Sequence, residues 1–271
     1  MPAYHGKTVA ITGGASGIGY ALAKEFGRLG ACIIIGEPSL ERLENAQKGL
    51  AADGIDARIS TLDVADAYSM EDFADFSWAQ TGAVDLLINN AGIGLDAKRM
   101  INVKLEDLRR LFDVNVFGVW HGAASFGRRM IAQKSEAAIY NVASENAFFN
   151  AAPYMAAYIA SKHAVRGLTE AMREEFPSHI RIGMICPGLV ASEMTASAFG
   201  DYAMPADEFA QKVVVQIQNG AFYVVTHGYN IERIKPVHAD IEAAYAERAP
   251  RHADDARYDV RLIIEELQKG Q

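Results

Sequence analysis

A tyrosine and a lysine four residues apart, Tyr158 and Lys162, are the residues of this chain whose types and spacing most directly suggest chemistry. The surrounding sequence predicts a helix, on which positions i and i+4 share one face. A free tyrosine has a pKa near ~10, and lowering it to ~7 takes roughly 4 kcal/mol of preference for the phenolate. A neighbouring ammonium group in a partly dry site can supply much of that preference. The pair therefore suggests acid/base chemistry on a hydroxyl or carbonyl group, whereas most pairs at this spacing are solvated helix surface.

A glycine-rich segment near the start of the chain, Thr12 to Gly19, suggests a dinucleotide site rather than a purely structural turn. It lies between the first predicted strand and the first predicted helix. Gly13 permits a tight turn, Gly17 lets the backbone approach a pyrophosphate, and Gly19 allows close helix–strand packing. The pyrophosphate would lie at the helix N-terminus, where free amides and the helix dipole favour anions. The predicted cofactor contacts of this loop are Gly13, Ser16, Gly17, Ile18 and Gly19.

An acidic residue, Glu37, follows the second predicted strand, eighteen residues after Gly19. A carboxylate at this place can accept hydrogen bonds from the ribose hydroxyls of adenosine, and it would repel a 2′-phosphate. We therefore predict NAD as the cofactor in preference to NADP. Arg42 is the one nearby cation that would favour NADP, and it is otherwise expected to be a solvated helix residue.

Short apolar runs alternate along the chain with longer amphipathic segments. The predicted strands are 7–11, 31–35, 57–62, 84–88, 138–142, 180–186 and 222–226. The predicted helices are 18–29, 40–52, 69–80, 105–133, 154–175 and 207–218. This order predicts right-handed βαβ units and an α/β fold with a mostly parallel sheet. In such sheets, ligands bind beyond the carboxyl ends of the strands, at the switch point.

The composition bounds the class of protein. Half of the 271 residues are apolar, which is enough for one sizeable core. The net charge is −8 and no lysine/arginine block stands out, so nucleic acid is not an expected partner. We expect no membrane span and no signal peptide, and therefore a cytoplasmic protein. Cys32 and Cys186 lie in predicted strands and are expected to be buried free thiols, and His227 and His238 lack partners at metal-ligand spacing, so no metal is expected.

The last part of the chain differs from the rest. We predict a main domain at 1–227 and a charged, helical C-terminal extension at 228–271. Its apolar residues recur at helical spacing and favour two amphipathic helices: Val237, Ile241, Tyr245, Val260, Ile264 and Leu267. Two interpretations stay open, packing on the domain surface and a role as a lid or subunit contact.

Further short motifs follow the predicted strands and complete a set with a definite order. The set is Thr12 to Gly19, Asp63-Val64, Asn89 to Gly92, Asn115, Ser144, Tyr158 with Lys162, and Pro187-Gly188. In this order the chain resembles the single-domain short-chain dehydrogenases/reductases, over about residues 7 to 192. The resemblance implies a Rossmann-type, doubly wound parallel sheet of about seven strands. It also implies nicotinamide-dependent chemistry on an alcohol or ketone.

The resemblance also implies roles for individual residues. Tyr158 would exchange the hydroxyl proton, and Lys162 would lower its pKa and bind the nicotinamide ribose. Ser144 would steady the carbonyl oxygen, and Asn115 would hold a water linking Lys162 to solvent. The remaining cofactor contacts would be Asp63, Val64, Asn90, Ala91, Gly92, Pro187, Gly188, Val190 and Ser192, together with Tyr158 and Lys162.

Three departures from the family pattern are visible. Ser192 stands where a threonine is usual, and Ala143 where a serine often precedes Ser144. The spacing from Ser144 to Tyr158 is fourteen residues, one more than in many members, which the loop 145–153 must absorb. The usual glycine-rich C-terminal ending is replaced by the charged extension, which leaves the geometry of an oligomer open.

The substrate pocket is predicted from residues in two loops. They are Asn146, Phe149, Tyr154, Met194, Phe199 and Tyr202. Such an aromatic lining would suit a bulky or aromatic secondary alcohol, although the same residues could simply pack. We predict an NAD-dependent dehydrogenase acting on a small-molecule alcohol or ketone. The alternatives are an NADP-dependent carbonyl reductase and a non-catalytic dinucleotide sensor. The family resemblance further implies a homodimer or homotetramer through helices 105–133 and 158–175.

Overall fold

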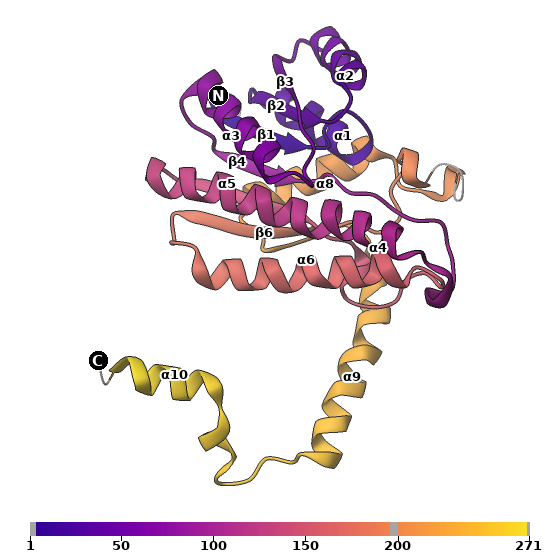
Figure 1. Ribbon diagram of the computed structural model, residues 1–271, viewed down its shortest axis with the longest axis vertical. Coiled ribbons are helices and arrows are strands. Elements are labelled where there is room, and N and C mark those ends of the chain that lie inside the picture. Colours follow the sequence, from indigo (N-terminus) through magenta and orange to yellow (C-terminus); the bar gives the residue numbers. More distant parts are fainter. Residues whose placement is uncertain (1–3, 196–199, 270–271) are drawn as a thin grey trace. The chain divides into compact units, whose positions relative to one another are not determined.

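A parallel sheet of seven strands, in the order β3-β2-β1-β4-β5-β6-β7, runs through the first of two units of the chain (Figure 1). The structure, a computed structural model, describes residues 4–195 and 200–269. The strands are β1 (Thr8–Thr12), β2 (Cys32–Glu37), β3 (Ala57–Thr61), β4 (Leu86–Asn89), β5 (Ala137–Val142), β6 (Ile180–Cys186) and β7 (Tyr223–Val225). The order reverses between β1 and β4, so the carboxyl ends of these two strands form the switch point. The predicted doubly wound α/β fold is confirmed.

Helices cover both faces of this sheet. They are α1 (Gly17–Arg28), α2 (Leu40–Ala52), α3 (Ala67–Thr81), α4 (Leu105–Phe112), α5 (Gly118–Gln133), α6 (Ala156–Glu175) and α8 (Ala206–Gln218). Val9 and Ile11 of β1 pack with α1, α2 and α8, whereas Ala10 packs with α3, α5 and α6 on the other face. Because both faces are buried, the central strands are continuous apolar runs, which is why the sequence identifies them.

Most element bounds differ from the sequence predictions by one or two residues. Glu37 is the last residue of β2 rather than the residue after it. Both cysteines are free, but only Cys186 is buried; Cys32, at the start of β2, is partly exposed, which corrects the prediction of two buried thiols.

The region 105–133, predicted as one continuous helix, is interrupted. A π-helical turn at Asp113–Phe117 separates α4 from α5. It contains Asn115, whose buried side chain accepts a hydrogen bond from the Ile93 amide (2.8 Å) and donates one to the Ile93 carbonyl (2.9 Å). Such turns occur mostly as single bulges within α-helices, frequently at functional sites. Hydrophobic periodicity does not detect the bulge, because the buried residue of the turn is the polar Asn115, while the buried apolar residues Leu111 and Val119 continue the inner face on either side.

Helix α5 approaches the sheet very closely at two glycines. A Cβ added to Gly118 would lie 2.7 Å from Cγ2 of Val64, and one added to Gly122 would lie 2.1 Å from Oδ1 of Asn89. Asn89 ends β4 and is buried, and its Nδ2 donates to Oδ1 of Asn141 on β5 (2.9 Å). Any side chain at these glycines would push the helix away from the sheet.

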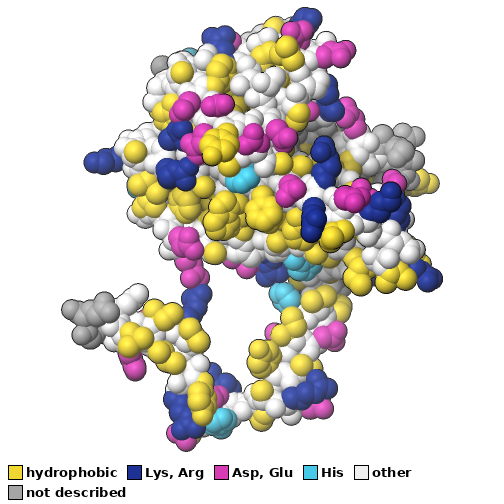
Figure 2. Space-filling view, viewed as in Figure 1, with side chains coloured by type: hydrophobic (Ala, Val, Ile, Leu, Met, Phe, Trp, Pro, Cys, Tyr) yellow, Lys and Arg dark blue, Asp and Glu magenta, His cyan; other side chains and the backbone are white. Residues whose placement is uncertain are grey.

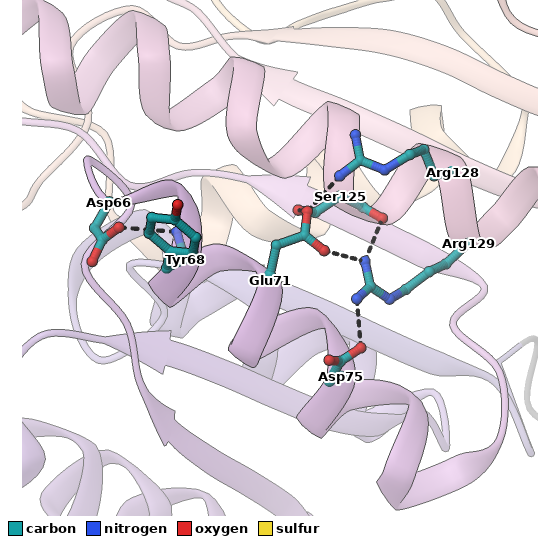
Figure 3. A network of polar contacts seen from close by, with 7 residues as sticks. All are labelled: Asp66, Tyr68, Glu71, Asp75, Ser125, Arg128 and Arg129. Carbon is teal, nitrogen blue, oxygen red and sulfur yellow. Dashed lines mark hydrogen bonds and ion pairs between the residues drawn. The ribbon is translucent and has the colours of Figure 1, made fainter.

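A polar network joins α3 to α5 on the surface (Figure 3). Glu71 accepts hydrogen bonds from Ser125, Arg128 and Arg129. Arg129 also donates to Asp75, one turn further along α3. The Ser125 hydroxyl and then the two guanidinium groups hold the pKa of the Glu71 carboxyl below its usual range. The network fixes the register of two neighbouring helices on one face of the sheet.

The second unit, Tyr229–Gln271, contains α9 (Ile231–Arg248) and α10 (Val260–Lys269). Both helices that the apolar spacing predicts are therefore present. Hydrophobic side chains are visible on the surface of both helices (Figure 2). Ile241, Tyr245 and Leu267 are among the exposed ones. None of the described helices is long and apolar enough to span a bilayer.

Candidate active site

The loop between β1 and α1 forms a cradle with the features of a pyrophosphate site. Gly13 (φ 64°) and Gly17 (φ 52°) adopt left-handed backbone conformations, and a Cβ on Gly19 would lie 2.3 Å from the Gly13 carbonyl oxygen. Among the described residues, no side chain caps the N-terminus of α1, and its first turn holds no acidic residue. The amides that begin the helix are therefore available to an anion. The loop residues predicted from the sequence fit a dinucleotide.

Hydrogen bonds across the switch point hold this loop in place. The Thr12 hydroxyl accepts from the amides of Asn90 and Ala91 (3.0 Å each). The Asn90 side chain donates to the carbonyls of Thr12 (3.0 Å) and Gly13 (2.9 Å). Asn90, predicted to bind the cofactor, thus has its amide group directed to the loop itself. Its observed contribution is to the shape of the cradle.

The residues that follow β3 point in different directions. Asp63 is exposed, and its carboxylate accepts a hydrogen bond from the Ala65 amide (3.0 Å), so an acidic group lies at the surface after β3. Val64 is buried against α5, and its carbonyl receives a hydrogen bond from the His121 ring (2.9 Å). Of the two, only the Asp63 carboxylate is accessible to a ligand through its side chain.

The carboxylate of Glu37 lies at the end of β2, only 14% exposed, with Nε of Arg42 at 3.7 Å from it. Burial raises the pKa of Glu37, the Arg42 guanidinium lowers it, and the negative charge of Glu193 raises it. The group stands where a ribose hydroxyl of adenosine is expected.

The four predicted catalytic residues converge beside the carboxyl ends of β4 and β5. Ser144 follows β5 and is buried, and Tyr158 and Lys162 lie on α6. The Lys162 ammonium donates to the Val142 carbonyl (3.0 Å) and lies 5.5 Å from the centre of the Tyr158 ring. A Cβ added to Gly92 would lie 3.4 Å from Oδ1 of Asn115 and 3.7 Å from Nζ of Lys162, so Asn115 reaches the same place.

The electrostatics of this group differ from the expected effect of Lys162 on Tyr158. Burial raises the pKa of Tyr158 to about 12; the hydrogen bond from Ser144 partly offsets this, and the charge of Glu145 adds to it. Burial likewise lowers the pKa of Lys162 to about 8. The ammonium is directed to the Val142 carbonyl, and the dry site disfavours both charged forms.

His227, which was weighed from the sequence only as a possible metal ligand, contacts the segment that follows β6. The Gly188 amide donates to Nδ1 of His227 (3.3 Å), and Nε2 of His227 lies 3.3 Å from the Leu189 carbonyl oxygen. A Cβ on Gly188 would lie 2.6 Å from the imidazole ring. No sequence signal marks this contact, because thirty-nine residues separate the partners. Among the described side chains, no group of three or more His, Cys, Asp or Glu could hold a metal ion.

Further along the same segment, Val190 is buried and Ser192 lies against the glycine loop, with its Cβ 3.2 Å from a Cβ added to Gly17. Thr195 is a second residue that the sequence missed. Its hydroxyl accepts from the Ser192 amide (3.0 Å) and donates to the Val190 carbonyl (2.8 Å). The usual threonine of the family is absent at Ser192, and the Thr195 hydroxyl holds this turn.

The predicted substrate residues are only partly brought together. The buried Asn146 donates to the Ser144 hydroxyl (3.4 Å), and Phe149 is also buried. Met194 lies beside Gly94 in the loop after β4. Tyr202 is 91% exposed, and Phe199 lies outside the described residues.

Tyr154 differs from its predicted place at the start of a helix. It precedes α6 in a left-handed conformation (φ 63°) and is 56% exposed. Its carbonyl accepts from the Lys98 amide (2.9 Å), which holds this part of the loop against the segment after β4.

Comparisons with known proteins agree with the motif order. The sequence matches the short chain dehydrogenase family over residues 7–203. It is 31% identical over 228 residues to 1-deoxy-11-beta-hydroxypentalenate dehydrogenase of Streptomyces avermitilis, covering 81% of this chain and 84% of that protein. It is 35% identical over 192 residues to a mitochondrial borneol dehydrogenase of Lavandula x intermedia, covering 70% and 71% respectively.

The fold comparison gives the same result. A short chain dehydrogenase/reductase from Burkholderia phymatum, solved in complex with NAD, superposes with a TM-score of 0.85 at 27% identity, covering 93% of this chain and 99% of that one. The seven-stranded parallel sheet flanked by helices matches this solved structure. The chain belongs to the short-chain dehydrogenase/reductase family.

Proposed function

We propose that this protein is an NAD-dependent dehydrogenase that oxidises a secondary alcohol, or reduces the ketone in reverse. One observation carries the proposal: Ser144, Tyr158 and Lys162 meet beside the switch point where the glycine loop offers a dinucleotide cradle. The names of the two relatives, dehydrogenases of a hydroxypentalenate and of borneol, support an alcohol as substrate.

In this proposal, one group of residues binds the cofactor and another handles the proton and the charge on the substrate oxygen. The start of α1 would hold the pyrophosphate, Glu37 the adenosine ribose, and Lys162 the nicotinamide ribose. When bound, the nicotinamide accepts or donates the hydride exchanged with the carbinol carbon. Tyr158 exchanges the hydroxyl proton, and Ser144 stabilises the charge that develops on the substrate oxygen. With its pKa raised to about 12, Tyr158 keeps its proton at neutral pH and is suited to donate it to a ketone oxygen.

The proposal is tested with a panel of secondary alcohols and ketones against both cofactors, read by nicotinamide absorbance. We expect turnover of at least one bulky or aromatic pair, with a higher kcat/KM for NAD than for NADP. The Tyr158→Phe variant should bind NADH and lose nearly all turnover. Retained turnover in that variant would refute the mechanism.

An NADP-dependent carbonyl reductase is the second candidate, and the position of Arg42 favours it. This guanidinium stands within 3.7 Å of Glu37, where it could meet a 2′-phosphate. A higher kcat/KM with NADP in the same panel would select this alternative.

We also propose a homodimer or homotetramer. Large apolar side chains are exposed along the region from α4 to α5: Leu105, Phe117, Trp120 and Ile131. Such a row is unusual on a monomer surface and suits a helix contact between subunits. Light scattering at micromolar concentration should give a multiple of the chain mass, and a monomer would contradict the proposal.

A further inference from the structure

A short segment after β6, residues 192–195, spans from the glycine loop to the loop after β4. At one end, Cβ of Ser192 lies 3.2 Å from a Cβ added to Gly17. At the other, Cγ and Sδ of Met194 lie 3.4 Å from a Cβ added to Gly94. The segment therefore contacts both sides of the switch point. Glu193, the charged residue of this segment, lies between the two residues that make these contacts.

Glu193 forms an ion pair with Arg42 of α2. Nη2 of Arg42 donates to Oε2 of Glu193 (2.8 Å) and to the hydroxyl of Ser16 (2.7 Å). Nε of the same guanidinium lies 3.7 Å from Oε1 of Glu37. One cation thus stands among two carboxylates and the hydroxyl that begins α1. The three charges sum to −1 at the place where the adenosine ribose is expected.

This arrangement bears on the choice between the two nicotinamide cofactors. In dinucleotide sites of this kind, a carboxylate after the second strand binds the ribose hydroxyl of NAD, and a nearby arginine accommodates the 2′-phosphate of NADP. This chain has both groups, Glu37 and Arg42. Nη2 of Arg42 already donates a hydrogen bond to Glu193, which lies 151 residues away in the sequence.

We propose that Glu193 is a specificity-determining residue that disfavours NADP by engaging Arg42, the guanidinium that would otherwise be available to the 2′-phosphate. The inference rests on the proposed nicotinamide-dependent function. A 2′-phosphate would have to displace the Glu193 carboxylate from the guanidinium. NAD has no phosphate at this position, so it binds without this displacement.

The solvent exposure of the Glu193–Arg42 ion pair limits how much it can change the affinity for NADPH. The Glu193 side chain is 69% exposed and that of Arg42 42% exposed, so the pair is well screened by solvent. Exposed ion pairs contribute little, and their loss changes an affinity by about fivefold at most. We therefore expect Glu193→Gln to lower the Kd for NADPH by about fivefold, and to change the Kd for NADH by less than about twofold.

The experiment measures the Kd of NADH and NADPH on the full-length protein by nicotinamide fluorescence, without substrate. The variants are Glu193→Gln, Arg42→Ala and the double variant. Glu208→Gln is the matched control, because Glu208 is an exposed carboxylate paired with Lys212 on α8 (2.9 Å). The control should leave both Kd values unchanged. In the Arg42→Ala background, Glu193→Gln should no longer improve NADPH binding.

Three results would overturn the proposed role of Glu193. An unchanged ratio of the two Kd values in Glu193→Gln, with both dinucleotides bound, overturns the inference and leaves the proposed function standing. A gain for NADPH that persists without Arg42 also overturns it, because the effect would then bypass the guanidinium. If the wild-type protein binds neither dinucleotide, the proposed function fails and the inference fails with it.

Discussion

Tyr158 and Lys162 share a site that favours the neutral form of each side chain. Burial raises the pKa of Tyr158 to about 12 and lowers that of Lys162 to about 8. Burial is the largest cause of both shifts; Lys162 is buried in the fold, whereas Tyr158 is partly buried. The spacing of the two residues is visible in the sequence, whereas the dryness of their site depends on the helices and strands around them.

The raised pKa of Tyr158 predicts that alcohol oxidation and ketone reduction depend differently on pH. Alcohol oxidation needs the phenolate, which is the minor form below the pKa and increases about tenfold with each pH unit. The initial-rate kcat/KM for oxidation should therefore rise between about pH 7 and about pH 9, while that for ketone reduction stays nearly flat. Steady-state kinetics across this range test the prediction, and a flat oxidation profile would contradict it.

The lowered pKa of Lys162 predicts that the residue destabilises the fold. Its ammonium costs free energy as long as both states are protonated, which holds below the folded pKa of about 8. The penalty fades as the pH rises from there towards the unfolded value of ~10.4, where the lysine is neutral in both states. Lys162→Met should accordingly raise the free energy of unfolding at pH 7 by about 2 kcal/mol.

Chemical denaturation at a series of pH values measures this difference. The advantage of the methionine variant should shrink as the pH approaches about 10, because the wild-type lysine then loses its charge in both states. An advantage that is independent of pH would mean that packing, and not charge, is its cause.

At the scale of elements, the segment after β6 is held by His227, which follows β7 in the sequence. His227 accepts the Gly188 amide hydrogen and contacts the Leu189 carbonyl with its other nitrogen. His227→Phe should weaken NADH binding by about tenfold, because it leaves a backbone donor without its acceptor. His227→Gln, which keeps a donor and an acceptor, should restore part of the affinity. Fluorescence titration gives both values, and equal affinity in the phenylalanine variant would refute a positioning role.

Some elements could be predicted from the sequence and others could not. Strands such as β1 and β4 are buried on both faces, so their composition identifies them. The π-helical turn at Asp113–Phe117 could not be predicted from apolar spacing, because its buried residue is the polar Asn115 and the buried residues of α4 and α5 on either side are mostly apolar. The glycine loop and Tyr158 with Lys162 were predictable because their chemistry fixes their spacing. His227 and Glu193 were not, because each meets its partner only through the fold.

At the scale of the whole molecule, the buried apolar clusters among the described residues all belong to the first unit. The clusters of buried apolar residues begin at Val9 and extend no further than Val224. A chain that ends at Gly228 should therefore fold and bind NADH, with a melting temperature within a few degrees of the full-length value. Circular dichroism and fluorescence titration test this. Loss of a cooperative transition would mean that the core needs residues from 229 onward.

The close approach of α5 to β4 has a consequence for how relatives of this protein diverge. The Oδ1 atom of Asn89 is buried and has no hydrogen-bond partner among the described residues, and Gly122 leaves just enough room for it. A larger residue at 122 needs a smaller one at 89, since the helix and the strand are both fixed by their other contacts. Substitutions at these two positions should therefore be correlated across an alignment of homologues. Gly167 of α6, where nothing lies within 4 Å of an added Cβ and φ is not positive, should vary independently.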